Sequence, residues 1–227
     1  MTATPDARWV TFDCFGTLVD WHSGFSAILT PLVGARTPDV LRAYHRFERM
    51  LEAEAPHMLY RDVLTNALVR AADEAGAPIS AALARRLPES WASLPVFDDV
   101  EPMLAGLRDA GYRLGVLTNC DNDLFEQTAR SFRLPFDLVV TAERVRDYKP
   151  SWTHFRFFSR SSGVRASDWV HVACSWYHDI SPAREIGIRR VWLDRDRTGE
   201  DPATASLRVE SAGEVCDAIA TLFGSTR

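Results

Sequence analysis

The sequence has few cysteines, no long apolar run and no sign of a leader. Its 227 residues include only four cysteines, which lie far apart and form no C-x-x-C pair, so we expect free thiols and neither a zinc ribbon nor a disulfide framework. No apolar stretch approaches the roughly 18 residues that a membrane span needs. The first residues, MTATPDAR, lack the basic and apolar regions of a secretory leader. We therefore expect a cytoplasmic protein that does not bind membranes.

Positive charge is also scarce. Lys and Arg number 26 against 31 Asp and Glu, the net charge is -5, and no basic cluster stands out. This balance argues against nucleic acid as a partner. Hydrophobic residues make up 46% of the chain and charged residues 25%, which excludes a wholly disordered or fibrous protein and predicts a globular one with a sizeable core.

Five apolar stretches predict buried strands. They show little strict alternation of polar and apolar residues, which is typical of a parallel sheet covered on both faces. Amphipathic segments between them predict helices, several of them closed by glycine. The sequence therefore predicts an α/β fold, a doubly wound parallel sheet, with a polar loop before a last helix. The expected strands are 9–15, 112–119, 136–143, 168–175 and 188–195, and the expected helices are 100–111, 122–132, 151–163 and 181–187.

Residues 22–94 interrupt this alternation with helical patterns only. One helix is predicted to begin with Thr37 as its N-cap and Pro38 as its first residue, and a later one to stop at Gly76. We predict a helical cap domain, 22–94, inserted after the first strand of a core domain formed by 1–21 and 95–227. Such an insertion would lie over the carboxyl ends of the strands, where α/β proteins bind ligands.

Polar residues follow four of the predicted strands and segments: Asp13 in FDCFGTL, Thr118 and Asn119 in LTNC, Lys149 in YKP and Asp179 in SWYHD. The ends of parallel strands converge on one crevice, and these groups are the parts of a covalent hydrolase. Each also has a purely structural interpretation. Asp13 is at a turn before a glycine, and Asp179 is placed to cap the next helix.

In this order, FDCFGTLVDW, LTN, KP and SWYHD resemble the four motifs of the haloacid dehalogenase superfamily of hydrolases, whose cap is also inserted after the first strand. The resemblance covers nearly the whole chain and implies a Rossmann-like core. Within the superfamily the chain most resembles the type II, L-2-haloacid dehalogenase branch, because phosphatase relatives have a second Asp where this chain has Phe15. The resemblance implies the catalytic residues Asp13, Thr17, Lys149 and Asp179.

Phe15 separates two chemistries. A phosphatase expels an alkoxide, which needs a proton from that second Asp, whereas halide leaves without one. The resemblance implies that Asp13 forms an ester with a short 2-haloacid, that Lys149 offsets the charge of Asp13, and that Asp179 positions or activates water. It implies no metal cofactor. Cys174 and Ser175 stand where phosphatases have the additional carboxylate that helps to hold magnesium.

The resemblance also implies a set of substrate-binding residues. An arginine of the first long cap helix, Arg42 or failing that Arg46, is expected to pair with the substrate carboxylate. The chain departs from the family at Phe155, where dehalogenases have Tyr, and at Cys174 and Trp176, where they have Ser and Asn. The full set that we predict is Thr118, Asn119, Arg42, Phe15, Ser175 and Trp176.

Two other functions stay open. The first is a phosphatase of small molecules that depends on Mg²⁺, and the second is a non-catalytic binding protein that has lost turnover through Phe155 and Trp176. We expect a small-molecule partner in each case, and an apolar cap face would allow a homodimer. His171 and His178 are interpreted as structural or solvated and are left out of the site.

Overall fold

The computed structural model describes residues 7–224. Within them the sheet has six strands, all parallel, in the order β3-β2-β1-β4-β5-β6. The five strands predicted from the sequence are present, and β1, β2 and β4 at the centre of the sheet are almost wholly buried. The strands are β1 (Trp9–Phe12), β2 (Arg113–Thr118), β3 (Leu138–Thr141), β4 (Trp169–Ala173), β5 (Arg189–Leu193) and β6 (Leu207–Val209).

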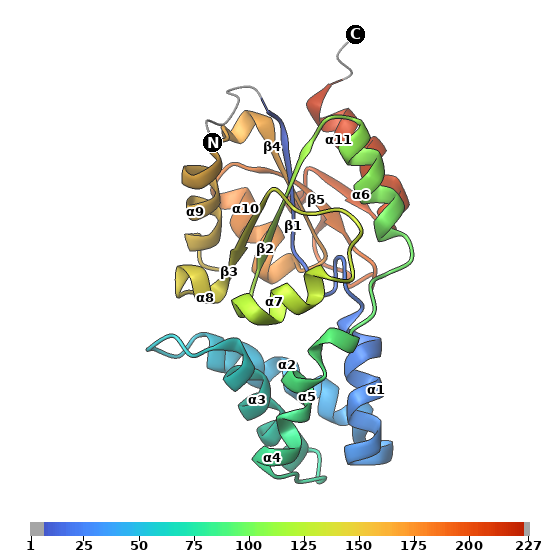
Figure 1. Cartoon of the computed structure of the whole chain (residues 1–227), viewed down its shortest axis with the longest axis vertical. Helices are drawn as coiled ribbons and strands as arrows, with labels where there is room; N and C mark the ends of the chain where they lie inside the picture. Colours follow the sequence, from blue (N-terminus) through green and yellow to red (C-terminus); the bar gives the residue numbers. More distant parts are fainter. Residues whose placement is uncertain (1–6, 225–227) are drawn as a thin grey trace.

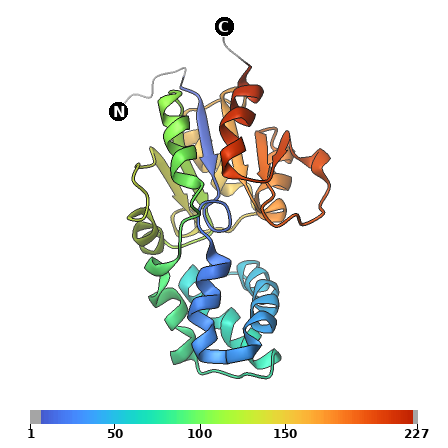
Figure 2. The same ribbon diagram turned by 90° about the vertical axis from the view of Figure 1, so that its right-hand side faces the viewer.

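Helices cover both faces of the sheet. Helices α6 and α11 lie side by side on one face, and α9 and α10 lie on the other (Figures 1 and 2). The predicted α/β fold with a doubly wound parallel sheet is therefore confirmed. The helices outside the insert are α6 (Val100–Asp109), α7 (Asn122–Ala129), α8 (Ala142–Val145), α9 (Thr153–Ser162), α10 (Ser181–Glu185) and α11 (Val215–Phe223).

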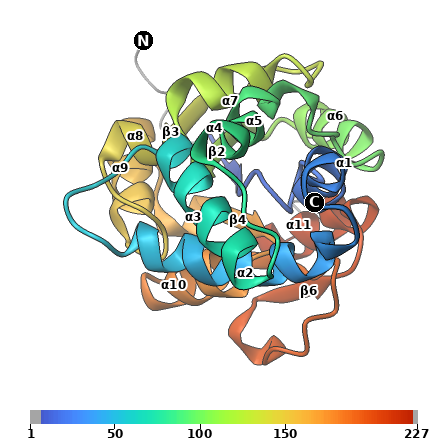
Figure 3. The same cartoon turned by 90° about the horizontal axis from the view of Figure 1, so that it is seen from below.

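A helical insert follows β1 and lies beyond the carboxyl ends of the central strands (Figure 1). Seen from below, α2 and α3 cross in front of the sheet (Figure 3). Helix α2 packs extensively against α3, and α1 packs against α2. The elements of the insert are α1 (Trp21–Val33), the short turn η1 (Gly34–Arg36), α2 (Thr37–Glu52), α3 (Tyr60–Glu74), α4 (Ala81–Ala84), α5 (Arg86–Glu89) and the short turn η2 (Trp91–Ser93).

Three local predictions are wrong. Thr37 is not an N-cap, because it already has helical torsion angles and its hydroxyl donates to the Gly34 carbonyl; Arg36 stands at the N-cap instead. The last part of the predicted helical segment 22–94, beyond Gly76, does not form one regular helix but is broken into α4, α5 and η2. The polar loop expected before the last helix stops at β6, a strand that the sequence did not predict, which begins at Leu207, pairs with β5 and extends the sheet by one strand.

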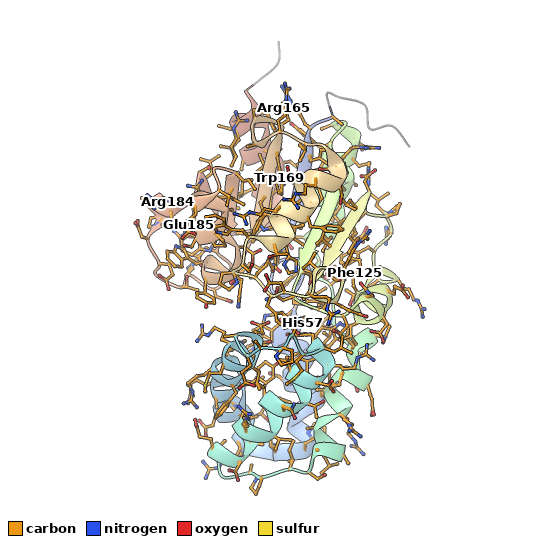
Figure 4. The ribbon with its side chains drawn as sticks, turned by 90° about the vertical axis from the view of Figure 1, so that its left-hand side faces the viewer. His57, Phe125, Arg165, Trp169, Arg184 and Glu185 are labelled. Atoms are coloured by element: carbon orange, nitrogen blue, oxygen red, sulfur yellow. The ribbon has the colours of Figure 1, made fainter. Side chains whose placement is uncertain are left out.

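A buried carboxylate joins the insert to the core. Asp121, which follows β2, accepts hydrogen bonds from the backbone N–H groups of Tyr60 at 2.7 Å and Arg61 at 3.0 Å. These groups belong to the first turn of α3, where the helix dipole favours a negative charge. His57 lies at the same junction (Figure 4). The centroid of its ring is 4.8 Å from that of Tyr148. The start of α3, and with it Tyr60, is thereby held against the core.

Candidate active site

A cavity of about 300 Å³ lies where the insert meets the carboxyl ends of the strands. Its core side is formed by the segments that follow β1, β2 and β4, together with Lys149. Its other side is formed mainly by α1, α2 and the start of α3. The core residues that line it include Asp13, Phe15, Thr118, Asn119, Lys149, Cys174, Ser175, Trp176, Tyr177, His178 and Asp179.

Asp13 stands just beyond β1 and is 7% exposed. Its Oδ2 atom accepts a hydrogen bond of 2.9 Å from the Thr17 hydroxyl, which itself accepts one from the Cys174 N–H. The tight turn between Asp13 and Thr17 needs Gly16, whose φ is +93° and where a Cβ atom would lie 2.7 Å from the sulfur of Cys174. The turn therefore presents the carboxylate of Asp13 to the cavity in one orientation.

Lys149 is the only lysine of the sequence. Its ammonium is 1% exposed and donates to Asp13 Oδ1 at 2.8 Å, to Asp179 Oδ1 at 2.7 Å and to the Leu117 carbonyl at 2.9 Å. Three donors thus meet three acceptors. A compact ammonium on a flexible stem can fill such a position between two carboxylates, whereas a planar guanidinium requires more room.

A chain of buried hydrogen bonds orients Asp179. The Trp169 indole N–H donates to the Thr11 hydroxyl at 2.7 Å, and that hydroxyl lies 2.8 Å from His171 Nδ1. Because the ionised Asp179 can only accept, His171 Nε2 carries the hydrogen that reaches Asp179 Oδ1 at 2.9 Å, and in the neutral ring Nδ1 then accepts from the Thr11 hydroxyl. Within residues 7–224, the buried Oδ2 of Asp179 has no hydrogen-bond partner. This oxygen is the free acceptor of the site.

The charges of this cluster depend on one another. Burial would lower the pKa of Lys149, but Asp13 and Asp179 outweigh that effect and raise it. Burial likewise raises the pKa of Asp13, with Lys149 opposing it. For Asp179, the charge of Lys149 and the hydrogen bond from His171 overcome burial and lower the pKa to about 2. Lys149 therefore remains protonated and Asp179 ionised across the ordinary pH range.

Asn119 joins the core side of the cavity to the insert. Its side chain accepts a hydrogen bond from the Lys149 N–H at 2.8 Å and donates to the Glu52 carboxylate of α2 at 3.2 Å. Glu52 also forms an ion pair with His178 at 3.4 Å, and this partner raises the pKa of His178 in spite of burial, which lowers it. Thr118 is fully buried at the end of β2. Neither Thr118 nor Asn119 caps α7, whose N-cap is Asp121.

The remaining predicted residues of the core also reach the cavity. Phe15 packs against Trp91 of the insert, with ring centroids 4.7 Å apart. Ser175 accepts a hydrogen bond from the His178 N–H at the start of the π-helical turn Trp176–Ile180, which carries Asp179. Phe155 is not among the lining residues and packs instead on the ring of His171. Asp179 does not cap α10, which has no side-chain cap.

Arg42, which was predicted to bind the substrate carboxylate, does not line the cavity. It forms an ion pair with Asp39 at 3.1 Å, its side chain is 76% exposed, and it lines a separate surface hollow. Arg46 pairs with Glu74 and is directed away as well. Arg49, an exposed residue nearer the end of α2, is the arginine of this helix that lines the cavity, and it packs over the ring of Tyr177.

We predict that Arg42→Ala leaves kcat/KM within about twofold of the wild-type value, because exposed ion pairs contribute little. Steady-state kinetics with any substrate that the wild type turns over would check this. Arg49→Ala is the matched variant, two turns further along the same helix. A tenfold or larger rise in KM for Arg42→Ala alone would show that this arginine reaches the substrate.

Sequence reasoning missed most of the insert's contribution to the cavity. It set aside His178, which lines the cavity, and His171, which supports Asp179. The only available signal was the position of His178 next to Asp179. The residues of the insert that line the cavity are Trp21, Phe25, Tyr44, His45, Glu48, Arg49, Glu52, Tyr60 and Trp91.

The oxygen atoms that could bind a metal ion are arranged around the ammonium of Lys149. Among residues 7–224, no three His, Cys, Asp or Glu side chains are grouped so as to hold a metal ion. The thiol of Cys174, beside Thr17, is kept protonated because burial raises its pKa. The residues present therefore do not offer the oxygen-rich set that Mg²⁺ prefers.

A parallel α/β sheet with a cavity at its carboxyl edge is the arrangement in which α/β proteins bind their ligands. A family model described as "haloacid dehalogenase-like hydrolase" matches residues 7–187. The chain belongs to this family of hydrolases, as its motifs suggested.

Relatives and solved structures agree with this assignment. The chain is 26% identical over 209 residues to (S)-2-haloacid dehalogenase 1 of Pseudomonas sp. (strain CBS-3), covering 88% of this chain and 90% of that protein. It is 34% identical over 124 residues to a phosphoserine phosphatase of Thermus thermophilus, covering 53% and 50%. The structure of L-2-haloacid dehalogenase from Xanthobacter autotrophicus superimposes with a TM-score of 0.83 at 16% identity, covering 95% and 99%, and shares the fold.

No helix in the part of the chain that the structure describes is long and apolar enough to cross a membrane.

Proposed function

We propose that this protein hydrolyses a carbon–halogen bond, with Asp13 as the nucleophile and without a metal ion. The observation that carries the proposal is the position of the Lys149 ammonium, 2.8 Å from Asp13 and 2.7 Å from Asp179. Its charge opposes the rise in the pKa of Asp13 that burial causes, and its hydrogen bond orients the carboxylate.

The first step in this proposal is an attack by one oxygen of Asp13 on the carbon that bears the halogen. A carbon–oxygen bond forms while the halide departs with the bonding electron pair. The hydrogen bonds from Thr17 and Lys149 hold the carboxylate plane, so that little orientation is lost on approach. No proton is needed for the leaving group, which agrees with an apolar Phe15 beside the nucleophile.

The second step is hydrolysis of the ester. Water adds to the carbonyl carbon of the Asp13 ester and the carboxylate is regenerated. The unpaired Oδ2 of Asp179 is the acceptor that supports this water, since its Oδ1 is occupied by Lys149 and His171. The alcohol product leaves, and the proton released from water goes to solvent.

Chelation tests the metal-free part of the proposal. We predict that halide release is unchanged in excess EDTA and is not increased by added Mg²⁺, because Lys149 supplies the positive charge beside Asp13. Halide release and phosphate release would be followed in parallel on panels of short haloalkyl compounds and phosphate esters. Loss of activity with EDTA, with recovery on Mg²⁺, would favour the phosphatase alternative.

The predicted 2-haloacid substrate depended on a cap arginine. The names of the full-length relatives support it, but Arg42 does not reach the cavity. The charge of the cavity points to a different substrate.

A further inference from the structure

Two buried carboxylates of the insert form one wall of the cavity. Glu48 and Glu52 lie one turn apart on α2; Glu48 is 9% exposed and the side chain of Glu52 is 6% exposed. Glu48 accepts hydrogen bonds from the hydroxyls of Tyr60 at 2.6 Å and Tyr44 at 3.0 Å. Burial would raise the pKa of Glu48, but His45 and Tyr60 outweigh it and lower the pKa. Glu48 is therefore negatively charged. Burial raises the pKa of Glu52, and the neighbouring His178 opposes that rise.

Aromatic rings line the cavity next to these carboxylates. Trp91 contacts Phe15, Phe25 and Tyr60, with ring centroids 4.7 to 5.9 Å apart. Trp21 packs against Phe25 at 5.3 Å. The face of an aromatic ring attracts a cation through its quadrupole, most strongly when the cation is taken out of water. The aromatic and acidic walls thus favour the same kind of ligand.

The cavity has little positive charge to offer an anion. The ammonium of Lys149 is already occupied by Asp13, Asp179 and a carbonyl. Arg49 is exposed and lies over Tyr177. Each histidine of the cavity is paired with a glutamate, His45 with Glu48 and His178 with Glu52. The carboxylates that line the cavity are Asp13, Glu48, Glu52, Asp179, Asp196 and Glu200.

A substrate carboxylate in this cavity would be desolvated among like charges, which is costly. A cationic nitrogen would meet carboxylates and aromatic rings instead. We propose that the substrate is a small haloalkylammonium compound whose positively charged nitrogen binds between Glu48, Glu52 and the aromatic wall while its halogen-bearing carbon faces Asp13. This inference rests on the proposed carbon–halogen hydrolysis and names its substrate class.

The chemistry balances without a further reactant. Asp13 forms the carbon–oxygen bond, halide leaves with the electron pair, and water cleaves the ester to give an amino alcohol and free Asp13. The ammonium group takes no part in bond making. Its charge is used for binding alone, so unreactive ammonium ions are suitable probes of the site.

The test compares ligands of one shape and different charge. Choline and its uncharged isostere 3,3-dimethyl-1-butanol would be titrated into the wild-type protein, with acetate as the anionic probe, by calorimetry and tryptophan fluorescence. We expect choline to bind at least about tenfold more tightly than the isostere. Equal binding of the isostere, tighter binding of acetate, or no binding of choline would each overturn the proposal.

Variants locate the charge. Glu48→Gln and Glu52→Gln keep the size of the side chain. Each is expected to weaken the binding of choline at least about tenfold without changing the affinity for the isostere. Glu126→Gln, on the exposed surface of α7, is the matched control and should not change either ligand. Unchanged choline affinity in both folded variants, checked by circular dichroism, would place the cation elsewhere and contradict the proposal.

Turnover separates this inference from the proposed function. We expect 2-chloroethyltrimethylammonium to release chloride and 2-chloropropionate not to. Choline binding without any halide release would leave the cation site supported and contradict carbon–halogen hydrolysis. Halide release from 2-chloropropionate alone would support that chemistry and contradict the cationic substrate.

Discussion

Replacing Asp13 by Asn is expected to lower kcat by about a thousandfold or more, because a neutral amide is a poor nucleophile and cannot form the ester. The side chain keeps its size, and Thr17 and Lys149 remain as neighbours, so the fold should be retained. Halide release under saturating substrate would measure the loss. Glu126→Gln, a neutralised carboxylate far from the cavity, is the control for the charge change alone.

The fate of solvent oxygen identifies the mechanism behind that loss. When water attacks the ester carbonyl of Asp13, the oxygen that the product receives in the first turnover comes from the enzyme. A single turnover in ¹⁸O-labelled water, with enzyme in excess, should put ¹⁸O into the peptide that carries Asp13 and leave the alcohol unlabelled. Label found only in the product would mean direct attack by water and would contradict a covalent role for Asp13.

The core side of the site could be predicted from the sequence because it depends on local order. Asp13, Thr118 and Asn119 each follow a strand whose apolar run is plain, and parallel strands bring their ends to one edge. The weak point was β6, whose three residues, Leu207–Val209, lie in a polar stretch and form a strand only by pairing with β5. Long-range pairing of this kind leaves little trace in local sequence.

The cap side could not be predicted, for a physical reason. Glu48 and Glu52 look like solvated residues on an amphipathic helix. In the structure Glu48 is bonded to Tyr44 and to Tyr60 of α3, and Glu52 to Asn119 and His178 of the core. Arg42 does not line the cavity because of where it lies along the axis of α2. It lies seven residues before Arg49, which is about 10 Å at the helical rise per residue. The order of the motifs predicts which residues the core places in the site. The residues of the insert that line the cavity depend on how the insert packs against the core.

Lys149→Met is expected to damage both activity and stability, since it leaves Asp13 and Asp179 buried and unpaired. Breaking a buried ion pair by removing one partner costs about 3–5 kcal/mol of unfolding free energy. Turnover should fall close to the level of Asp13→Asn, because a carboxylate without a counter-charge takes up a proton and loses its nucleophilicity. Urea unfolding and halide release, compared with the wild type at pH 8, would measure the two effects.

The pH dependence of this loss has a definite sign. In the wild type, Asp179 has a pKa of about 2, so its contribution to stability is present above the ordinary carboxylate pKa and is lost only as the pH falls towards 2. In Lys149→Met the folded-state pKa values of both carboxylates rise above their unfolded values. The folded variant then binds protons more readily than the unfolded chain, so its stability deficit should shrink as the pH is lowered from 8 to 5.

A second substitution separates charge from packing. The double variant Lys149→Met with Asp179→Asn removes one of the two unpaired carboxylates, so it should recover part of the stability at pH 8 while activity stays lost. A deficit in Lys149→Met below about 1 kcal/mol that does not change between pH 5 and 8 would contradict the view that this ammonium neutralises the two aspartates. Because Lys149 is the sole lysine of the chain, no other ammonium side chain can take over its position.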